Sequence, residues 1–97
     1  MAKKRLPKGW TEGTAQELLG LTDEEAAMVE IRVRLANKVR EIRAKKRMSQ
    51  DKLAARIGST QPRVCKAEQA EASFDMLVRS LLALGVDRKE IGRAIAN

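Results

Sequence analysis

Apolar residues recur at steps of three and four along the middle of the chain. The residues that follow this period are Met28, Ile31, Leu35, Val39 and Ile42. Such spacing places side chains on one face of a helix. Thr22 and Glu25 precede the run with the spacing of a capping box, in which each side chain accepts a hydrogen bond from the other residue's backbone. The pattern predicts one long amphipathic helix over residues 23–46.

A second apolar stripe, on a neighbouring face of this helix, consists of Val29, Val33 and Ala36. It makes the first half of the helix apolar around more than half of its circumference. Two interpretations fit such a face, and both stay open at the level of sequence. The stripe is either buried against the N-terminal turn and the C-terminal helices, or it is a seam for a dimer or another partner.

A pair of short helices is predicted next. Ser49 begins a helix over residues 50–57, and Gly58 supplies the left-handed residue that ends it. Thr60 is expected to cap the following helix, over residues 61–69. Pro62 lies in the first turn of that helix, where a missing backbone donor costs no hydrogen bond. This pattern predicts a helical hairpin with a tight turn.

Capping signals also predict the remaining elements. Ser73 precedes a helix that Gly85 ends, and Asp87 opens a last short helix. Thr14 begins another capping-box spacing, which predicts one or two helical turns before Gly20. No strand pattern occurs in the sequence. We therefore expect an all-α fold, with a basic N-terminal arm and short helical turn over residues 1–20 and a helical domain over residues 21–97.

Composition narrows the possible functions. The chain has 97 residues, no histidine and a single cysteine. It is too short for an enzyme cleft of the usual size, and it lacks the residues of a common Cys/His zinc site, a Cys–His catalytic pair and a glycine-rich phosphate loop. We therefore expect that the protein is not an enzyme and that it binds neither a metal nor a cofactor. No apolar run predicts a membrane span or a secretory signal, so a cytoplasmic protein is expected.

The positive charge is concentrated in one segment. Residues 41–70 hold eight basic and three acidic residues, so five of the seven net positive charges fall there. A localised excess is typical of a nucleic-acid binder, whereas charge alone also fits a soluble basic surface. The cations Arg43, Lys45, Lys46 and Arg47 suit the end of the long helix, and we expect them to reach phosphates as well.

The aromatic residues bear on the kind of nucleic acid and on possible partners. Trp10 and Phe74 are the only two, which is too few for a platform that stacks single-stranded bases. Duplex DNA is therefore the expected ligand. Trp10 itself is either a plug that packs on the core or an anchor for a partner protein.

The hairpin resembles a known family. Its residues Ser49, Gln50, Leu53, Ala54, Gly58, Thr60, Gln61, Val64 and Glu68 resemble the helix-turn-helix of the XRE family, the phage Cro and repressor type. The resemblance covers residues 39–84. A wider pattern, from Gly9-Trp10 to the Leu-Leu-Ala-Leu-Gly segment that ends at Gly85, resembles small stand-alone members that include HigA-like antitoxins. The implied fold is a lambda-repressor-like helical bundle with an N-terminal extension.

The resemblance implies roles for individual residues. The second helix of the hairpin is expected to enter the major groove of double-stranded DNA, with Gln61 reading a base. Gln50 and Thr60 are expected to bind phosphate, and Gln50 also to brace Gln61. Arg63 is assigned to phosphate or guanine and Lys66 to the groove. The expected DNA-binding set is Ser49, Gln50, Arg56, Thr60, Gln61, Pro62, Arg63, Cys65 and Lys66.

Several residues depart from the family pattern. Pro62 replaces an amide that phage repressors use on a base, so apolar contact with a thymine methyl is expected instead. Cys65 is either a small tolerated residue or a redox switch that evicts DNA. The segment Gln69-Ala70-Glu71 replaces a glycine-bearing loop, so the second helix is expected to run on a little.

These observations predict a sequence-specific repressor that binds an inverted-repeat operator as a homodimer. The narrower expectation is an antitoxin that represses its own promoter and neutralises a toxin protein encoded beside it. Two rivals remain at this level. One is a protein-interaction module without specific DNA binding, and the other is a non-specific nucleoid-type binder.

Overall fold

The structure is a computed structural model that describes residues 12–96, and these residues form helices and connecting turns without any strand. The helices are α1 (Glu12–Leu19), α2 (Asp23–Lys45), α3 (Gln50–Arg56), α4 (Gln61–Glu68), α5 (Phe74–Ala83) and α6 (Arg88–Ala96). The expected all-α class is thereby confirmed. Trp10 and the basic start of the expected arm lie outside the described residues.

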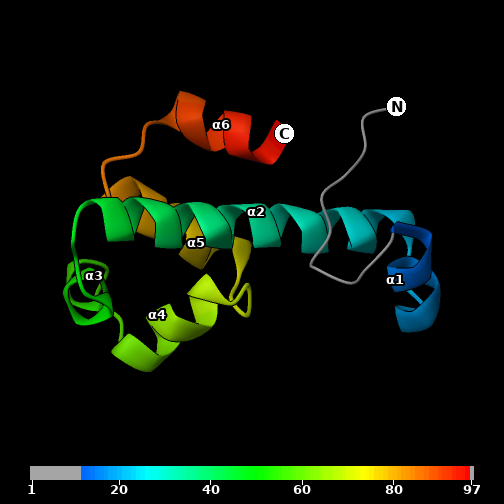
Figure 1. The fold of residues 1–97 in the computed structure, drawn as a ribbon, viewed down its shortest axis with the longest axis horizontal. Coiled ribbons are helices and arrows are strands. Elements are labelled where there is room, and N and C mark those ends of the chain that lie inside the picture. The colour runs from blue at the N-terminus through cyan, green and yellow to red at the C-terminus, as the bar shows by residue number, and fades with distance from the viewer. Residues whose placement is uncertain (1–11, 97) are drawn as a thin grey trace.

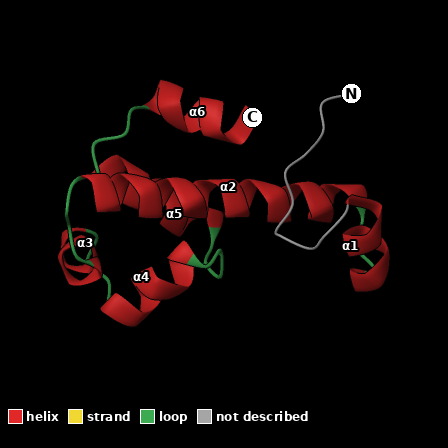
Figure 2. Cartoon of the chain, viewed as in Figure 1, coloured by secondary structure: helices red, strands yellow, loops and turns green. Residues whose placement is uncertain are grey.

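Helix α2 is the frame on which the other helices are arranged. Helices α3 and α4 lie on one side of its C-terminal half and α6 on the other, while α1 lies at its N-terminal end (Figures 1 and 2). The length of α2 therefore separates the helical hairpin from α1. None of the described helices is long and apolar enough to cross a membrane.

Side chains cap most of these helices as the sequence predicts. The backbone N–H of Glu25 donates to the hydroxyl of Thr22 at 3.1 Å, and the N–H of Thr22 donates to the Glu25 carboxylate at 3.0 Å. This capping box begins α2, and the donation by the Thr22 backbone holds the pKa of the Glu25 carboxyl below its usual range. The hydroxyls of Ser49 and Ser73 cap α3 and α5 by accepting from the backbone N–H of Lys52 and Met76, without the reciprocal bond of a capping box.

Two capping predictions are wrong. Thr14 lies inside α1, because that helix begins at Glu12. Thr60 occupies the position before α4 in an extended conformation, but its side chain makes no capping hydrogen bond. A cap hydroxyl at this position binds the N–H of the second or third helical residue. Pro62, the second residue, has no N–H, and the Thr60 side chain does not bind the N–H of Arg63, the third.

The end of α4 also differs from the prediction. The helix stops at Glu68 instead of running on, and Ala70 adopts a left-handed backbone with φ of 64°. The N–H of Glu71 then donates to the carbonyl of Lys66 at 2.8 Å, which closes the helix. Ala70 thus takes the conformation that glycine usually supplies at this place.

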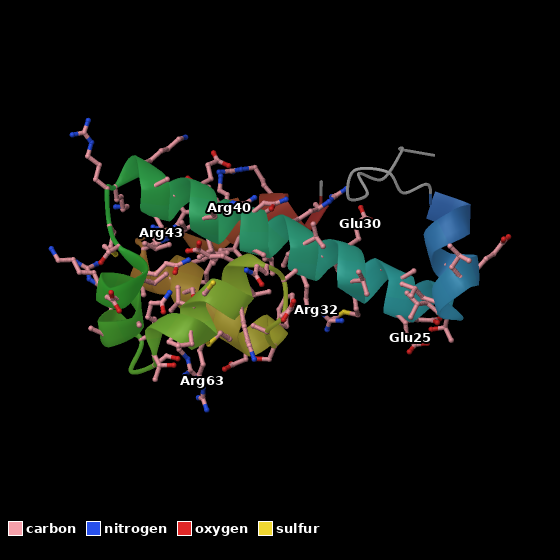
Figure 3. All side chains as sticks on the ribbon, turned by 60° about the horizontal axis from the view of Figure 1, so that its bottom comes forward. Glu25, Glu30, Arg32, Arg40, Arg43 and Arg63 are labelled. Atoms are coloured by element: carbon pink, nitrogen blue, oxygen red, sulfur yellow. The ribbon has the colours of Figure 1, made fainter. Side chains whose placement is uncertain are left out.

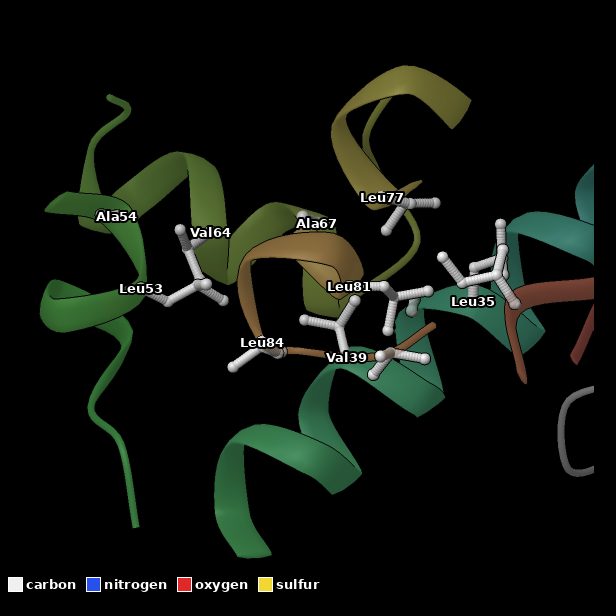
Figure 4. Close-up of a cluster of buried hydrophobic side chains, with 12 residues drawn as sticks. Leu35, Val39, Leu53, Ala54, Val64, Ala67, Leu77, Leu81 and Leu84 are labelled. Atoms are coloured by element: carbon white, nitrogen blue, oxygen red, sulfur yellow. The ribbon is translucent and has the colours of Figure 1, made fainter. Parts of the chain in front are cut away.

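The core joins α2 to the three helices that follow it. Its largest fully buried side chains include Leu35 and Val39 of α2, Leu53 of α3, Val64 of α4, Leu77 and Leu81 of α5, and Leu84 directly after α5. Figure 4 shows these side chains pointing toward one another from the four helices. Because every one of the four helices contributes, the hairpin is held in a fixed position relative to α2.

The long apolar stripe of α2 is covered along only part of its length. Leu35 and Val39 are fully buried, but Met28 is exposed. The second stripe divides in the same way, since Ala36 is buried and Val29 is exposed. Burial in the bundle therefore accounts for the C-terminal part of both stripes and leaves the N-terminal part uncovered.

Replacing Ala70 by glycine is expected to stabilise the protein. Glycine removes the cost of a left-handed alanine, which should raise the free energy of unfolding by about 0.5 to 1 kcal/mol after the greater freedom of the unfolded chain is allowed for. Ala55→Gly, on the exposed face of α3, is the matched control and should lower it by about 0.5 to 1 kcal/mol. Urea unfolding measures both variants, and a loss of stability in both would contradict the assignment.

Candidate nucleic-acid interface

Helices α3 and α4 form the predicted hairpin. Gly58 has a φ of 64°, and the backbone N–H of Ser59 donates to the carbonyl of Ala54 at 2.9 Å, so the chain reverses directly after α3. The small side chain of Ala54 is buried beside Leu53 and Val64. The crossing of the two helices is therefore fixed by the core and by a turn that needs a left-handed residue.

A chain of side-chain hydrogen bonds connects the start of α4 to its end. The side-chain amide of Gln61 donates to the carbonyl oxygen of Gln50 at 2.6 Å. The amide of Gln50 donates in turn to Oε1 of Glu68 at 3.1 Å. The expectation that Gln50 braces Gln61 is confirmed. Glu68 ends the helix that Gln61 begins, so this series of hydrogen bonds also connects α3 to both ends of α4.

Arg43 of α2 completes this polar chain. Its Nε donates to Oε2 of Glu68 at 2.5 Å, and a terminal nitrogen donates to Oε1 at 3.0 Å. The other terminal nitrogen donates to the backbone carbonyl of Met48 at 2.8 Å. We call Arg43, Glu68, Gln50 and Gln61 the polar chain. It runs from the frame helix to the first residue of α4.

The ion pair within the polar chain is largely shielded from water. The side chain of Glu68 is 4% exposed and that of Arg43 is 18% exposed. The hydrogen bonds to Glu68 raise the pKa of Arg43, against the effect of its partial burial. An arginine side chain is protonated throughout the accessible pH range, so the guanidinium stays charged and the carboxylate keeps its partner.

The role of Arg43 differs from the prediction. This residue was expected to reach phosphates with its neighbouring cations, but both of its nitrogen edges are used inside the protein. A signal for a buried partner was present in α4, where Val64, Ala67 and Glu68 follow the spacing of one buried face. An acidic residue on such a face requires a cation. Nothing in the spacing identifies which of the many cations it is.

The other face of α4 is open to solvent. Pro62, Arg63 and Lys66 are exposed, and neither Arg63 nor Lys66 forms an ion pair with any residue that the structure describes. Figure 3 shows Arg63 extending from α4 away from the bundle. Gln61 is half-buried at the edge of this face. The structure thus brings together an oriented amide, a proline ring and two cations at the start and middle of one helix.

The two hydroxyls beside this face are in different states. Ser49 accepts the backbone N–H of Lys52 at 3.1 Å, so its oxygen already serves as a cap. Thr60 is exposed and caps nothing, which leaves its hydroxyl available as a donor next to the start of α4. A hydroxyl and backbone N–H groups at a helix start are groups that commonly bind phosphate.

Two residues of the expected DNA-binding set, Arg56 and Cys65, are not among the exposed residues of this face. Arg56 is at the far end of α3 from Gln50, where it donates to the carbonyl of Ala83 at 3.2 Å. Cys65 is a free, half-buried thiol that accepts a hydrogen bond from the Gln69 amide at 3.7 Å. Among the described residues no cluster of acidic and cysteine side chains could hold a metal ion.

Breaking the ion pair of the polar chain should be costly. Arg43→Met leaves the Glu68 carboxylate buried without its cation, and we expect a loss of about 3 to 5 kcal/mol in the free energy of unfolding. The double variant Arg43→Met/Glu68→Leu removes both charges and should recover most of that loss. Chemical denaturation of both variants measures the difference. Equal stability of the single variant and the unaltered protein would contradict the burial.

Comparison with known proteins agrees with this geometry. A family model described as a helix-turn-helix domain matches residues 17–89, which includes α3, α4 and the helices that hold them. No curated protein and no solved structure shows significant similarity to the chain. The match spans well over half of the sequence, and the hairpin at its centre has the expected turn and core. The chain belongs to the helix-turn-helix domain family.

Proposed function

We propose that this chain is a transcriptional regulator that binds a specific sequence of double-stranded DNA and represses by occupying its site. The observation that carries the proposal is the polar chain, which holds the Gln61 amide in one orientation at the exposed start of α4. In a helix-turn-helix, the second helix lies in the major groove, and the residues at its N-terminal end contact the bases.

The bond to Gln50 leaves Gln61 able to read a base. A glutamine amide has two N–H donors and one carbonyl acceptor, and Gln50 occupies one donor. The remaining donor and the carbonyl oxygen match the acceptor and donor that adenine presents in the major groove. Adenine is therefore the base that we assign to Gln61.

The neighbouring residues supply phosphate contacts and further readout. Arg63 is assigned to phosphate or guanine, and Lys66 to the groove, because both cations are exposed on the open face of α4. Thr60 and Gln50 are assigned to phosphate, with Ser49 beside them. Pro62 offers an apolar contact to a thymine methyl.

Arg56 and Cys65 belong to the edge of the proposed interface. Arg56 bonds the end of α5, so it contributes charge near the DNA more than a directed contact. Cys65 lies one turn into α4 after Gln61, where a small half-buried residue lets the helix approach the groove. These placements make the start of α4 the centre of recognition.

We further propose that the protein acts as a homodimer on an inverted repeat. One domain with few direct base contacts binds weakly, and two linked domains gain affinity from the second half-site. Residues 21–97 would form the DNA-binding domain, and residues 1–20 an extension to it. The narrower role of an autoregulating antitoxin rests on the resemblance stated above, and a toxin gene beside this one would support it.

Selection of genomic fragments by the purified protein at near-physiological salt tests the proposal. We expect recovery of a short inverted repeat. Gln61→Ala should relax the preference at one base pair per half-site by about 1 to 3 kcal/mol. Arg63→Ala, if the residue contacts phosphate, should weaken binding to all sequences and reduce the salt slope by about one.

Arg88→Ala is the control, because it removes an exposed cation from α6 on the other side of α2 (Figure 1). It should leave the selected sequence unchanged. Recovery of DNA without a shared sequence, lost steeply with added salt, would indicate a non-specific nucleoid-type binder. Recovery of no DNA would favour the protein-interaction module.

A further inference from the structure

The N-terminal part of the described chain carries an uncovered apolar surface. Five large hydrophobic residues of the described part are exposed, and four of them lie on α1 or the first two turns of α2. These four are Leu18, Leu19, Met28 and Val29, of which Leu18 is 76% and Met28 38% exposed. Apolar residues that cluster in this way mark an interaction surface more often than scattered ones do.

The surface of α2 there is hollowed and has an ordered charge pattern. An open groove of about 330 Å³ is lined by Leu21, Glu24, Glu25, Met28, Val29 and Arg32. Within α2 the two carboxylates come first, Met28 and Val29 follow, and the guanidinium of Arg32 comes last, while Leu21 lines the groove just before the helix. Figure 3 shows Glu25 and Arg32 on one side of α2, with Glu30 and Arg40 on the other. We call the six lining residues the α2 groove.

The order of charges is complementary to itself in one orientation only. Glu24 and Arg32 each lie four residues from Met28. If a second α2 lies antiparallel, with a two-fold axis beside Met28, Glu24 of each copy faces Arg32 of the other. A parallel pair would place Glu24 against Glu24 and Arg32 against Arg32, which is repulsive. A two-fold interface uses the same patch on both copies, as this pattern requires.

We propose that the α2 groove is the homodimer interface and that its occupant is the α2 groove of a second copy, packed antiparallel around Met28. The exposed apolar side chains of α1, Leu18 and Leu19, extend the contact beyond the groove. The inference deepens the proposed function and rests on it for the biological use of the dimer, but the interface itself needs no DNA.

The position of the groove is compatible with DNA binding. Arg43, the residue that holds the end of α4, lies fifteen positions after Met28 in α2, which corresponds to about 22 Å along a helix. Figure 1 shows α1 and the hairpin at opposite ends of α2. A second copy seated at the groove therefore leaves the exposed face of α4 uncovered.

Sedimentation velocity without DNA, across a range of protein concentrations, tests the interface by a charge exchange. Glu24→Lys alone and Arg32→Glu alone each replace both cross-copy attractions with repulsions, and each should raise the dimer dissociation constant by about tenfold or more. An equimolar mixture of the two variants should recover a dimer, since opposite charges then face each other at both places. The double variant Glu24→Lys/Arg32→Glu should recover it also.

Two further variants, each with a glutamate in place of an exposed apolar residue, test the position of the two-fold axis. Met28→Glu brings like charges together at the two-fold axis and should give a monomer. Leu82→Glu, at a leucine of α5 that is more exposed than Met28, should stay dimeric. Circular dichroism confirms that each variant is folded. An unaltered protein that is monomeric at tens of micromolar, or a dimer that survives Met28→Glu and both single charge reversals, overturns the proposal.

A half-site duplex separates this inference from the proposed function. One copy of the protein is enough to occupy it, so Met28→Glu should bind the half-site as the unaltered protein does and lose only the added affinity for the full repeat. If the unaltered protein does not bind the half-site duplex, the result counts against the proposed function, and the dimer measurement stays valid.

Discussion

The ion pair between Arg43 and Glu68 determines how the two functional helices are held. It joins the C-terminal part of α2 to the end of α4 with two hydrogen bonds at low exposure. Two charges in such a place lose hydration that their attraction only partly returns, so the pair gives little net stability. Its effect is to exclude other arrangements, because any shift of α4 along α2 would leave a buried charge unpaired.

This constraint reaches the DNA-facing surface through Gln50. The amide of Gln50 can satisfy Glu68 and accept from Gln61 in only one orientation, since its nitrogen donates and its oxygen accepts. The orientation of Gln61 therefore follows from the position of a buried carboxylate at the other end of the same helix. An amide that is ordered before binding loses less conformational entropy when it meets a base, which favours discrimination between bases.

Local signals explain what the sequence could predict. The capping of Thr22, Ser49 and Ser73 and the left-handed Gly58 depend on neighbours within a few residues, so helix positions could be predicted to within one or two residues. The failures depended on more distant or more specific context. Thr60 occupies the cap position of α4, but its hydroxyl makes no capping bond, and no residue type beside it signals this. The stop at Ala70 needed a conformation that alanine disfavours. The pairing of Arg43 spans 25 residues and has no local signature.

The same helix supports two surfaces, and their separation has a physical reason. The C-terminal half of α2 buries its apolar face in the core, and its Arg43 pairs with Glu68. These two contacts fix the position of the hairpin. Along the N-terminal half of α2, the helices that the structure describes leave Met28 and Val29 exposed beside charges of both signs. Because α2 is one continuous helix, it fixes the position of the α2 groove relative to the hairpin. The distance and angle between two paired copies would then be set by α2 itself, and with them the spacing of the half-sites that two α4 helices can reach together.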